Sequence, residues 1–135
     1  MKQIPQISKY MTVVPHTVDY EQTIDKAETL MRENNIRHLP VTRAGKLVGL
    51  LSDKDVKSVL AFAGTDPAKV KVGDVCEDEV FTVEPAATID EVAEIMAEKK
   101  FGSALVVDNN KLVGIFTVID SLQALAEVTR QKFHR

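Results

Sequence analysis

The chain has 135 residues, of which 44% are hydrophobic, so it can form one compact domain or two small halves that depend on each other. Its 17 basic and 20 acidic residues give a net charge of −3, which argues against a nucleic-acid-binding surface. A single cysteine excludes an internal disulfide, and no stretch approaches the ~20 apolar residues of a membrane span. We therefore expect a soluble, cytoplasmic protein that binds neither nucleic acid nor membrane.

The first half of the chain predicts the order β-α-β-β-α. The predicted elements are a helical turn at 7–11, a strand at 16–18, a helix from Thr23 to residue 34, strands at 39–42 and 47–51, and a helix at 53–63. The Thr23 hydroxyl is expected to accept a capping hydrogen bond at the start of its helix. Gly64-Thr65-Asp66-Pro67 then breaks the chain.

The second half repeats the first at an offset of 65 residues (114 minus 49), without a gap from residues 17–56 to 82–121. Identical pairs include Thr17/Thr82, Ile24/Ile89, Met31/Met96, Leu47/Leu112, Gly49/Gly114 and Asp55/Asp120. The repeat predicts strands at 104–107 and 112–116, a helix at 118–132, and a helix that begins with a Thr88–Glu91 capping box.

Two copies indicate a pseudo-symmetric pair rather than a solenoid, which needs about three or more repeats. A unit of about 60 residues buries too little surface to stand well alone, so the two copies should pack on each other. We therefore predict an α/β fold of two β-α-β-β-α repeats, with residues 1–64 as repeat 1 and its lead-in, 65–71 as a linker and 72–135 as repeat 2.

A strand-to-helix junction occurs once in each copy and is the main candidate site. In the first copy, Gly49, Ser52 and Asp55 stand three residues apart where the apolar strand meets the helix. The free N–H groups of a helix start favour an anion, and a carboxylate one turn later suits the vicinal diol of a ribose. An ordinary helix cap also explains Ser52 and Asp55, but it does not require the glycine. The second copy keeps all three residue types at the same spacing: Gly114, Thr117 and Asp120.

Cationic and apolar residues lie side by side before the first hairpin strand of each copy. Arg37 and His38 occupy this position in the first copy, and Lys100 and Phe101 occupy it in the second. A cation next to an apolar group suits a phosphate attached to a base, although the helix dipole also favours cations at a helix end. No residues have the spacing of metal ligands or of a nucleophile–base pair, so we expect no metal site and no catalytic residue.

The repeat order, the doubled Gly-x-x-Ser/Thr-x-x-Asp and the segment Ile36-Arg37-His38-Leu39-Pro40-Val41 resemble a pair of cystathionine-β-synthase (CBS) domains, also called a Bateman module. The resemblance covers nearly the whole chain. It implies a disc with pseudo-two-fold symmetry and two clefts, which in this family commonly bind AMP, ADP or ATP and sometimes S-adenosylmethionine or NAD. It also implies that the motif Asp takes the ribose hydroxyls, that Ser or Thr faces the phosphate, and that no cofactor is required.

The family's clefts combine residues from both repeats, and the resemblance assigns two ligand-binding sets. One set comprises Thr117, Asp120, Thr12, His16, Ile36, Arg37 and His38. The other comprises Ser52, Lys54, Asp55, Val80, Phe81, Lys100, Phe101 and Gly102.

Two differences between the copies predict unequal clefts. Ile119 stands where the first copy has Lys54, which removes a cation beside the second junction. The second copy also has Cys76-Glu77-Asp78-Glu79 where the first has the Met-Thr start typical of the family, and these acidic residues would repel a nearby phosphate.

Two functions are consistent with these features. The first is a regulatory module, not an enzyme, that binds an adenine nucleotide and passes a conformational change to an unknown client protein. The second is a dimerisation or scaffold module with empty clefts, since Ile119, Leu122 and Leu125 form an apolar stripe on the last predicted helix. Both interpretations allow a homodimer.

Overall fold

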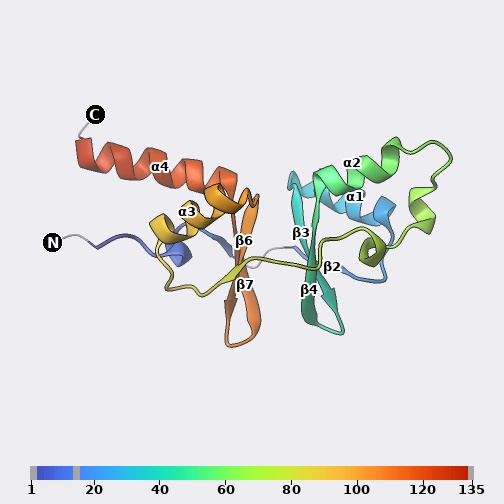
Figure 1. Cartoon of the computed structure of the whole chain (residues 1–135), viewed down its shortest axis with the longest axis horizontal. Helices are drawn as coiled ribbons and strands as arrows, with labels where there is room; N and C mark the ends of the chain where they lie inside the picture. Colours follow the sequence, from blue (N-terminus) through green and yellow to red (C-terminus); the bar gives the residue numbers. More distant parts are fainter. Residues whose placement is uncertain (1–2, 14–15, 134–135) are drawn as a thin grey trace. The chain divides into compact units, whose positions relative to one another are not determined.

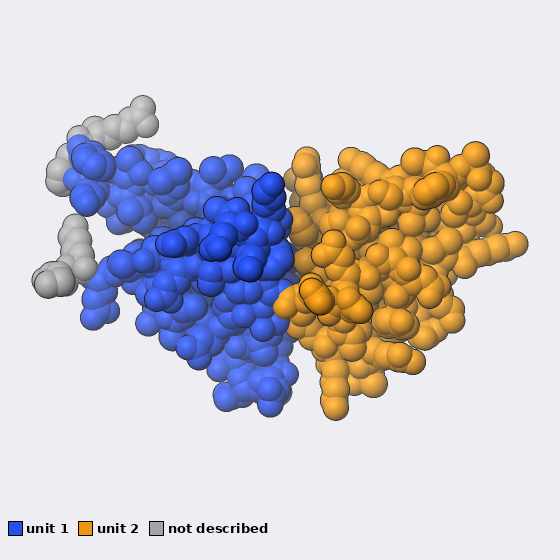
Figure 2. Space-filling view, viewed as in Figure 1, with its two compact units in different colours: residues 1–15, 81–135 blue, residues 16–80 orange. Residues whose placement is uncertain are grey.

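The computed structural model describes residues 3–13 and 16–133. The chain forms two compact units, coloured separately in Figure 2. Unit 2 is the continuous segment His16–Val80, whereas unit 1 combines Met1–Pro15 with Phe81–Arg135. The units thus divide the chain at different places from the sequence repeats.

Unit 2 contains the predicted β-α-β-β-α order, with helices and strands labelled in Figure 1. Its elements are β2 (Val18–Asp19), α1 (Ile24–Asn34), β3 (His38–Arg43), β4 (Lys46–Ser52), α2 (Asp53–Ala61) and the 3₁₀ helices η2 (Pro67–Lys69) and η3 (Val72–Asp74). Strand β3 lies at the centre of the sheet, parallel to β2 and antiparallel to β4. Helix α2 ends two residues before the predicted end.

Unit 1 repeats this arrangement and adds one edge strand. Its elements are η1 (Ile7–Lys9), β1 (Thr12–Val13), β5 (Thr82–Val83), α3 (Ile89–Lys99), β6 (Ser103–Asp108), β7 (Lys111–Thr117) and α4 (Val118–Phe133). The sheet order is β1-β7-β6-β5, with β5 parallel to β6 and the other neighbours antiparallel. The short strand β1 was not predicted from the sequence.

The lead-in of each sequence repeat packs on the sheet of the other repeat. In unit 1, Ile7 is fully buried and its N–H donates to the carbonyl of Ala87 at 2.7 Å. In unit 2, Val72 stands 65 residues later and is also fully buried, and its N–H donates to the carbonyl of Gln22 at 2.7 Å. Each unit is therefore completed by a segment that belongs to the other repeat in sequence.

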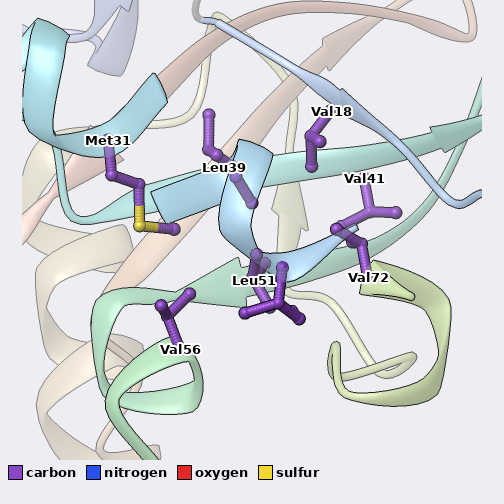
Figure 3. Packing of buried hydrophobic residues seen from close by; sticks show 9 residues of the cluster. Val18, Met31, Leu39, Val41, Leu51, Val56 and Val72 are labelled. Atoms are coloured by element: carbon purple, nitrogen blue, oxygen red, sulfur yellow. The ribbon is translucent and has the colours of Figure 1, made fainter. Parts of the chain in front are cut away.

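Each unit has its own hydrophobic core between its sheet and its helices. Figure 3 shows the core of unit 2, where Leu39 and Val41 of β3 and Leu51 of β4 meet Met31 of α1 and Val56 of α2. The core of unit 1 contains Ile7, Val92, Met96, Ala104, Val106 and Phe116. Residues at matching positions fill both cores, which confirms the two-repeat α/β fold that the sequence predicts.

The local signals at turns and helix ends were partly predictive. Both hairpins turn through two residues with positive φ, which is the geometry that two-residue hairpin loops prefer, at Ala44-Gly45 and Asn109-Asn110. The capping predictions for Thr23 and Thr88 were wrong, because neither side chain accepts a cap hydrogen bond. The Thr23 hydroxyl instead donates to the carboxylate of Asp25 in the first helical turn.

Candidate functional site

The first junction lies in unit 2, where β4 ends at Ser52 and α2 begins. The N–H of Asp55 donates to Ser52 Oγ at 3.1 Å, and the N–H of Ser52 donates to Asp55 Oδ2 at 3.0 Å. This reciprocal pair is a capping box, so the helix-cap interpretation of these residues is correct as far as it goes. The pair also fixes the position of the carboxylate at the start of the helix, as a ligand-binding acid requires.

The second junction, in unit 1, has the same geometry. The N–H of Thr117 donates to Asp120 Oδ2 at 2.8 Å, and the N–H of Asp120 donates to Thr117 Oγ1 at 3.3 Å. The Thr117 hydroxyl lies 3.2 Å from the same carboxylate oxygen. Both junctions are partly buried and hold a carboxylate beside a helix N-terminus, where the helix dipole stabilises negative charge.

The duplicated glycine is explained by packing within each unit. A Cβ on Gly49 would lie 2.6 Å from the carbonyl oxygen of Glu77, which crosses β4 at this point and exchanges two backbone hydrogen bonds with Leu50, both 2.9 Å. A Cβ on Gly114 would lie 3.0 Å from the carbonyl oxygen of Thr12. Each glycine therefore admits the crossing lead-in segment, and we do not count it among the ligand-binding residues.

A hollow of about 500 Å³ lies beside the first junction, entirely within unit 2. It is lined by residues from the start of β3, the end of β4 and one side of α2: Arg37, His38, Ser52, Asp53, Lys54, Lys57, Ser58 and Ala61. Four of these were predicted as ligand-binding residues, and four were missed. The four missed residues all belong to α2: Asp53, Lys57, Ser58 and Ala61. The last three follow Lys54 at helical spacing, so the helical periodicity of the sequence could have identified them.

His38 lies in the same hairpin as the first junction. Its register partner on β4 is Ser52, and the carbonyl of the preceding Arg37 accepts the N–H of Asp53 at 2.8 Å. Burial lowers the pKa of His38, an effect that Arg37 reinforces and that Asp55 and Asp53 oppose. The lowered pKa favours the neutral form of the imidazole. The structure thus groups Arg37 and His38 with Ser52, Lys54 and Asp55, whereas their assignment to the cleft of Asp120 stays a prediction.

The predicted residues near the second junction lie in unit 1. Phe101 is exposed and its ring stacks on Phe81 at 5.3 Å between centroids, while the carbonyl of Gly102 accepts the N–H of Val118 at 3.2 Å. Lys100 ends α3 in the left-handed conformation, with φ of 61°. A structural role as helix cap therefore accounts for the position of Lys100.

Ser103 is a residue near this junction that the sequence reasoning missed. It is opposite Thr117 in the β6–β7 ladder and only 4% exposed, and its hydroxyl has no hydrogen-bond partner among the described residues. Buried hydroxyls are normally paired, so the lack of a partner among the described residues marks Ser103 as a candidate residue of this junction.

The remaining predicted residues are spread over other positions. Thr12 is exposed on β1 and pairs with Ile115, and His16 is exposed just before β2. Ile36 packs against the core of unit 2, and Val80 is half-buried at the end of that unit. Whether these four contact a ligand stays a prediction.

Over residues 3–13 and 16–133, no three side chains of His, Cys, Asp or Glu are grouped so that they could hold a metal ion. In the same part of the chain, every helix is too short or too polar to cross a lipid bilayer.

Known proteins with related sequences and folds share this architecture. The protein CBS domain-containing protein YhcV of Bacillus subtilis is 29% identical over 134 residues, which cover 92% of this chain and 95% of that protein. The structure of CBSX2 in complex with AMP has a TM-score of 0.79 and 27% identity, over 93% of this chain and 98% of that one.

A second solved structure is the CBS domain pair of protein MJ0100 in complex with 5′-methylthioadenosine and S-adenosyl-L-methionine. It has a TM-score of 0.81 and 25% identity, over 93% of this chain and 99% of that one. The family model named CBS domain matches this chain twice, at residues 7–61 and 72–127. The chain therefore belongs to the CBS-domain family and consists of a pair of these domains.

Proposed function

We propose that this chain is a regulatory module that binds an adenosine-containing ligand, such as AMP, ADP or ATP, and passes the binding signal to a partner protein. The observation that carries the proposal is the doubled junction, in which Ser52 and Asp55, and again Thr117 and Asp120, hold a carboxylate at the start of a helix. A carboxylate in this position suits the two adjacent hydroxyls of a ribose. The adenosine compounds bound to CBSX2 and to the MJ0100 domain pair support the same ligand class.

The proposed role is regulatory rather than catalytic. A ligand changes a conformational equilibrium only by the difference in its affinity for the two states, so an effector needs a site that is better formed in one of them. A ligand that contacts Asp55 and also the hairpin that holds His38 would supply that difference if one state brings these groups closer together. We place this role in the cytoplasm, in agreement with a single cysteine that cannot form an internal disulfide.

Isothermal titration calorimetry with AMP, ADP, ATP and S-adenosylmethionine tests the proposal. We expect the wild type to bind at least one of them more tightly than about 1 mM, and Asp55→Ala or Asp120→Ala to weaken that binding at least tenfold. Asp108→Ala is a matched control, because Asp108 is an exposed carboxylate opposite Lys111 at the turn end of the β6–β7 hairpin, whereas Thr117 lies at the other end. Binding of none of the four compounds would contradict the proposal.

A second function, dimerisation through α4, is favoured by a separate observation. Ile119, Leu122 and Leu125 of α4 are 63%, 54% and 62% exposed, and Phe133 at its end is 72% exposed. Apolar side chains in such a row on one helix mark a surface that another protein covers, and a second copy of this chain is the partner we propose. Sedimentation velocity tests this, since Leu122→Glu should convert a dimer into a monomer. A wild-type protein that sediments as a monomer at 100 µM, roughly the weak end of stable dimers, would contradict it.

A further inference from the structure

The hollow beside α2 carries an excess of positive charge. Of its lining residues, Arg37, Lys54 and Lys57 are cationic, and Asp53 is the single carboxylate. Lys57 Nζ lies 3.0 Å from Asp53 Oδ2, so these two charges offset each other. The ion pairs among the described residues involve neither Arg37 nor Lys54, which leaves two cations free to meet an anion.

The two free cations are held close to the junction. The carbonyl of Arg37 accepts a hydrogen bond from the N–H of Asp53, the first residue of α2, and Lys54 is the next residue of this helix. Both side chains are exposed, so a ligand can reach them without a change in the core. The N-terminus of α2 adds its dipole to the same region, which favours an anion further.

The second junction has the same backbone and none of these charges. The N–H of Val118 is tied to the carbonyl of Gly102, as that of Asp53 is to Arg37. The residues 65 positions after the eight that line the hollow are all uncharged: Gly102, Ser103, Thr117, Val118, Ile119, Leu122, Gln123 and Ala126. Two junctions with the same pair of capping hydrogen bonds thus differ in charge by two units at the matching positions, which makes each a control for the other.

The acidic run at 77–79 does not cancel this difference. Glu77, Asp78 and Glu79 belong to unit 2, but they are not among the residues that line the hollow. The backbone of Glu77 pairs with Leu50, and none of the three side chains forms an ion pair with Arg37 or Lys54 among the described residues.

We propose that the α2 junction is the phosphate-selective site of this chain, and that the α4 junction accepts an adenosine group without a preference for phosphate. This inference rests on the proposed function and assigns the charge of the ligand at each site. The phosphate of AMP carries a charge of about −2 at pH 7, because its second pKa is about 6, which matches the two free cations. At the α4 junction, Asp120 stands beside uncharged α4 side chains and the hydroxyl of Ser103, which has no partner among the described residues, so this junction offers a phosphate no cation at the matching positions.

The inference is tested by calorimetry with AMP, adenosine and inorganic phosphate as separate ligands. Arg37→Gln and Lys54→Ile are expected to weaken AMP binding at the stronger site about 5- to 30-fold each, because solvent screening reduces the contribution of a charged hydrogen bond at an exposed side chain to about 1–2 kcal/mol. Adenosine binding should change less than twofold. Raising KCl from 50 to 300 mM shortens the screening length roughly twofold. The AMP affinity of the wild type should fall over this range, and the AMP affinity of the two variants should fall less.

Two matched variants complete the test. Lys46→Ile removes a cation of unit 2 at the far end of β4 and should leave both affinities unchanged. Ile119→Lys places a cation where the first junction has Lys54, and it should raise AMP affinity at the second site without raising that for adenosine; because Ile119 is also on the proposed dimer face of α4, sedimentation velocity of this variant separates a change in oligomeric state from a change in binding. Circular dichroism melting confirms that each variant is folded.

The possible outcomes separate this inference from the proposed function. If the wild type binds neither AMP nor adenosine, the proposed function is overturned and this inference with it. If the wild type binds both, but Arg37→Gln and Lys54→Ile weaken AMP and adenosine equally or not at all, only this inference is overturned. Binding of inorganic phosphate as tightly as AMP would also overturn it, because the hollow would then be a phosphate site without a nucleoside.

Discussion

Replacement of Gly49 by alanine tests the explanation of the duplicated glycine. The added Cβ would lie 2.6 Å from the carbonyl oxygen of Glu77 and 3.0 Å from Cys76 Sγ. The oxygen is backbone and accepts the N–H of Leu50, so it cannot move without loss of the paired hydrogen bonds of 2.9 Å. Overpacking costs about 1–3 kcal/mol and each lost hydrogen bond about 0.5–1.5 kcal/mol, while the lower chain entropy of alanine returns about 0.5–1 kcal/mol. We expect a net destabilisation of about 2–3 kcal/mol.

Gly114→Ala is the matched variant and should be milder, at about 1 kcal/mol, because its closest contact is the flexible end of a side chain. That contact is Met11 Sδ at 2.5 Å, and the backbone oxygen of Thr12 lies further away at 3.0 Å. Urea unfolding gives the free energies, and hydrogen exchange at the Leu50 amide shows whether the Glu77 crossing is lost in Gly49→Ala. Equal stability of Gly49→Ala and wild type, with unchanged protection of Leu50, would refute the packing explanation.

Three further predictions concern the core and two titratable side chains. Ile7→Ala and Val72→Ala remove buried lead-in side chains, and each should cost about 2–4 kcal/mol in urea unfolding; a cost below about 1 kcal/mol would show that the lead-ins are dispensable. Because burial lowers the pKa of His38, its contribution to stability is present above about pH 6.5 and is lost as the pH falls through the lowered pKa. Between about pH 7 and 5, His38→Gln should therefore lose less free energy of unfolding than the wild type. Parallel plots of unfolding free energy against pH for the two proteins would contradict this. Burial raises the pKa of the Cys76 thiol most, and the negative charge of Asp78 raises it further. The reactive thiolate is therefore scarcer, and alkylation by iodoacetamide at pH 8 should be several-fold slower than in urea-unfolded protein. Equal rates in the two states would contradict this.

Much of the fold was predictable because the same signals occur twice. The second copy of the Gly-x-x-Ser/Thr-x-x-Asp junction predicted that each half has the same order of elements, and the structure confirms this order. The crossing of the lead-in segments was not predictable, because β1 has only two residues and Glu77 forms an isolated bridge. Such short pairings are determined by tertiary packing rather than by local pattern.

The candidate site was predictable at the junctions and less so around them. Ser52 and Asp55 are signalled by type and spacing, whereas the partners of His38 depend on which strands are hydrogen-bonded. The register of β3 and β4 places His38 opposite Ser52, a relation that no local motif encodes. Ser103 was missed because a buried serine in a strand gives no signal until its lack of a partner is known.

The exchange of lead-in segments also has a consequence for the order of folding. Unit 2 is one continuous stretch of chain, whereas unit 1 must bring Gln6 to Thr88 across 82 residues (88 minus 6). Closing a loop costs more entropy as its length grows, and an already compact insert shortens the effective loop. Unit 2 should therefore fold first, and its folding should shorten the loop that separates the two segments of unit 1. A unit of this size is marginal alone, but a peptide of residues 16–80 should then keep more helix by circular dichroism than one of residues 81–135, which lacks Ile7.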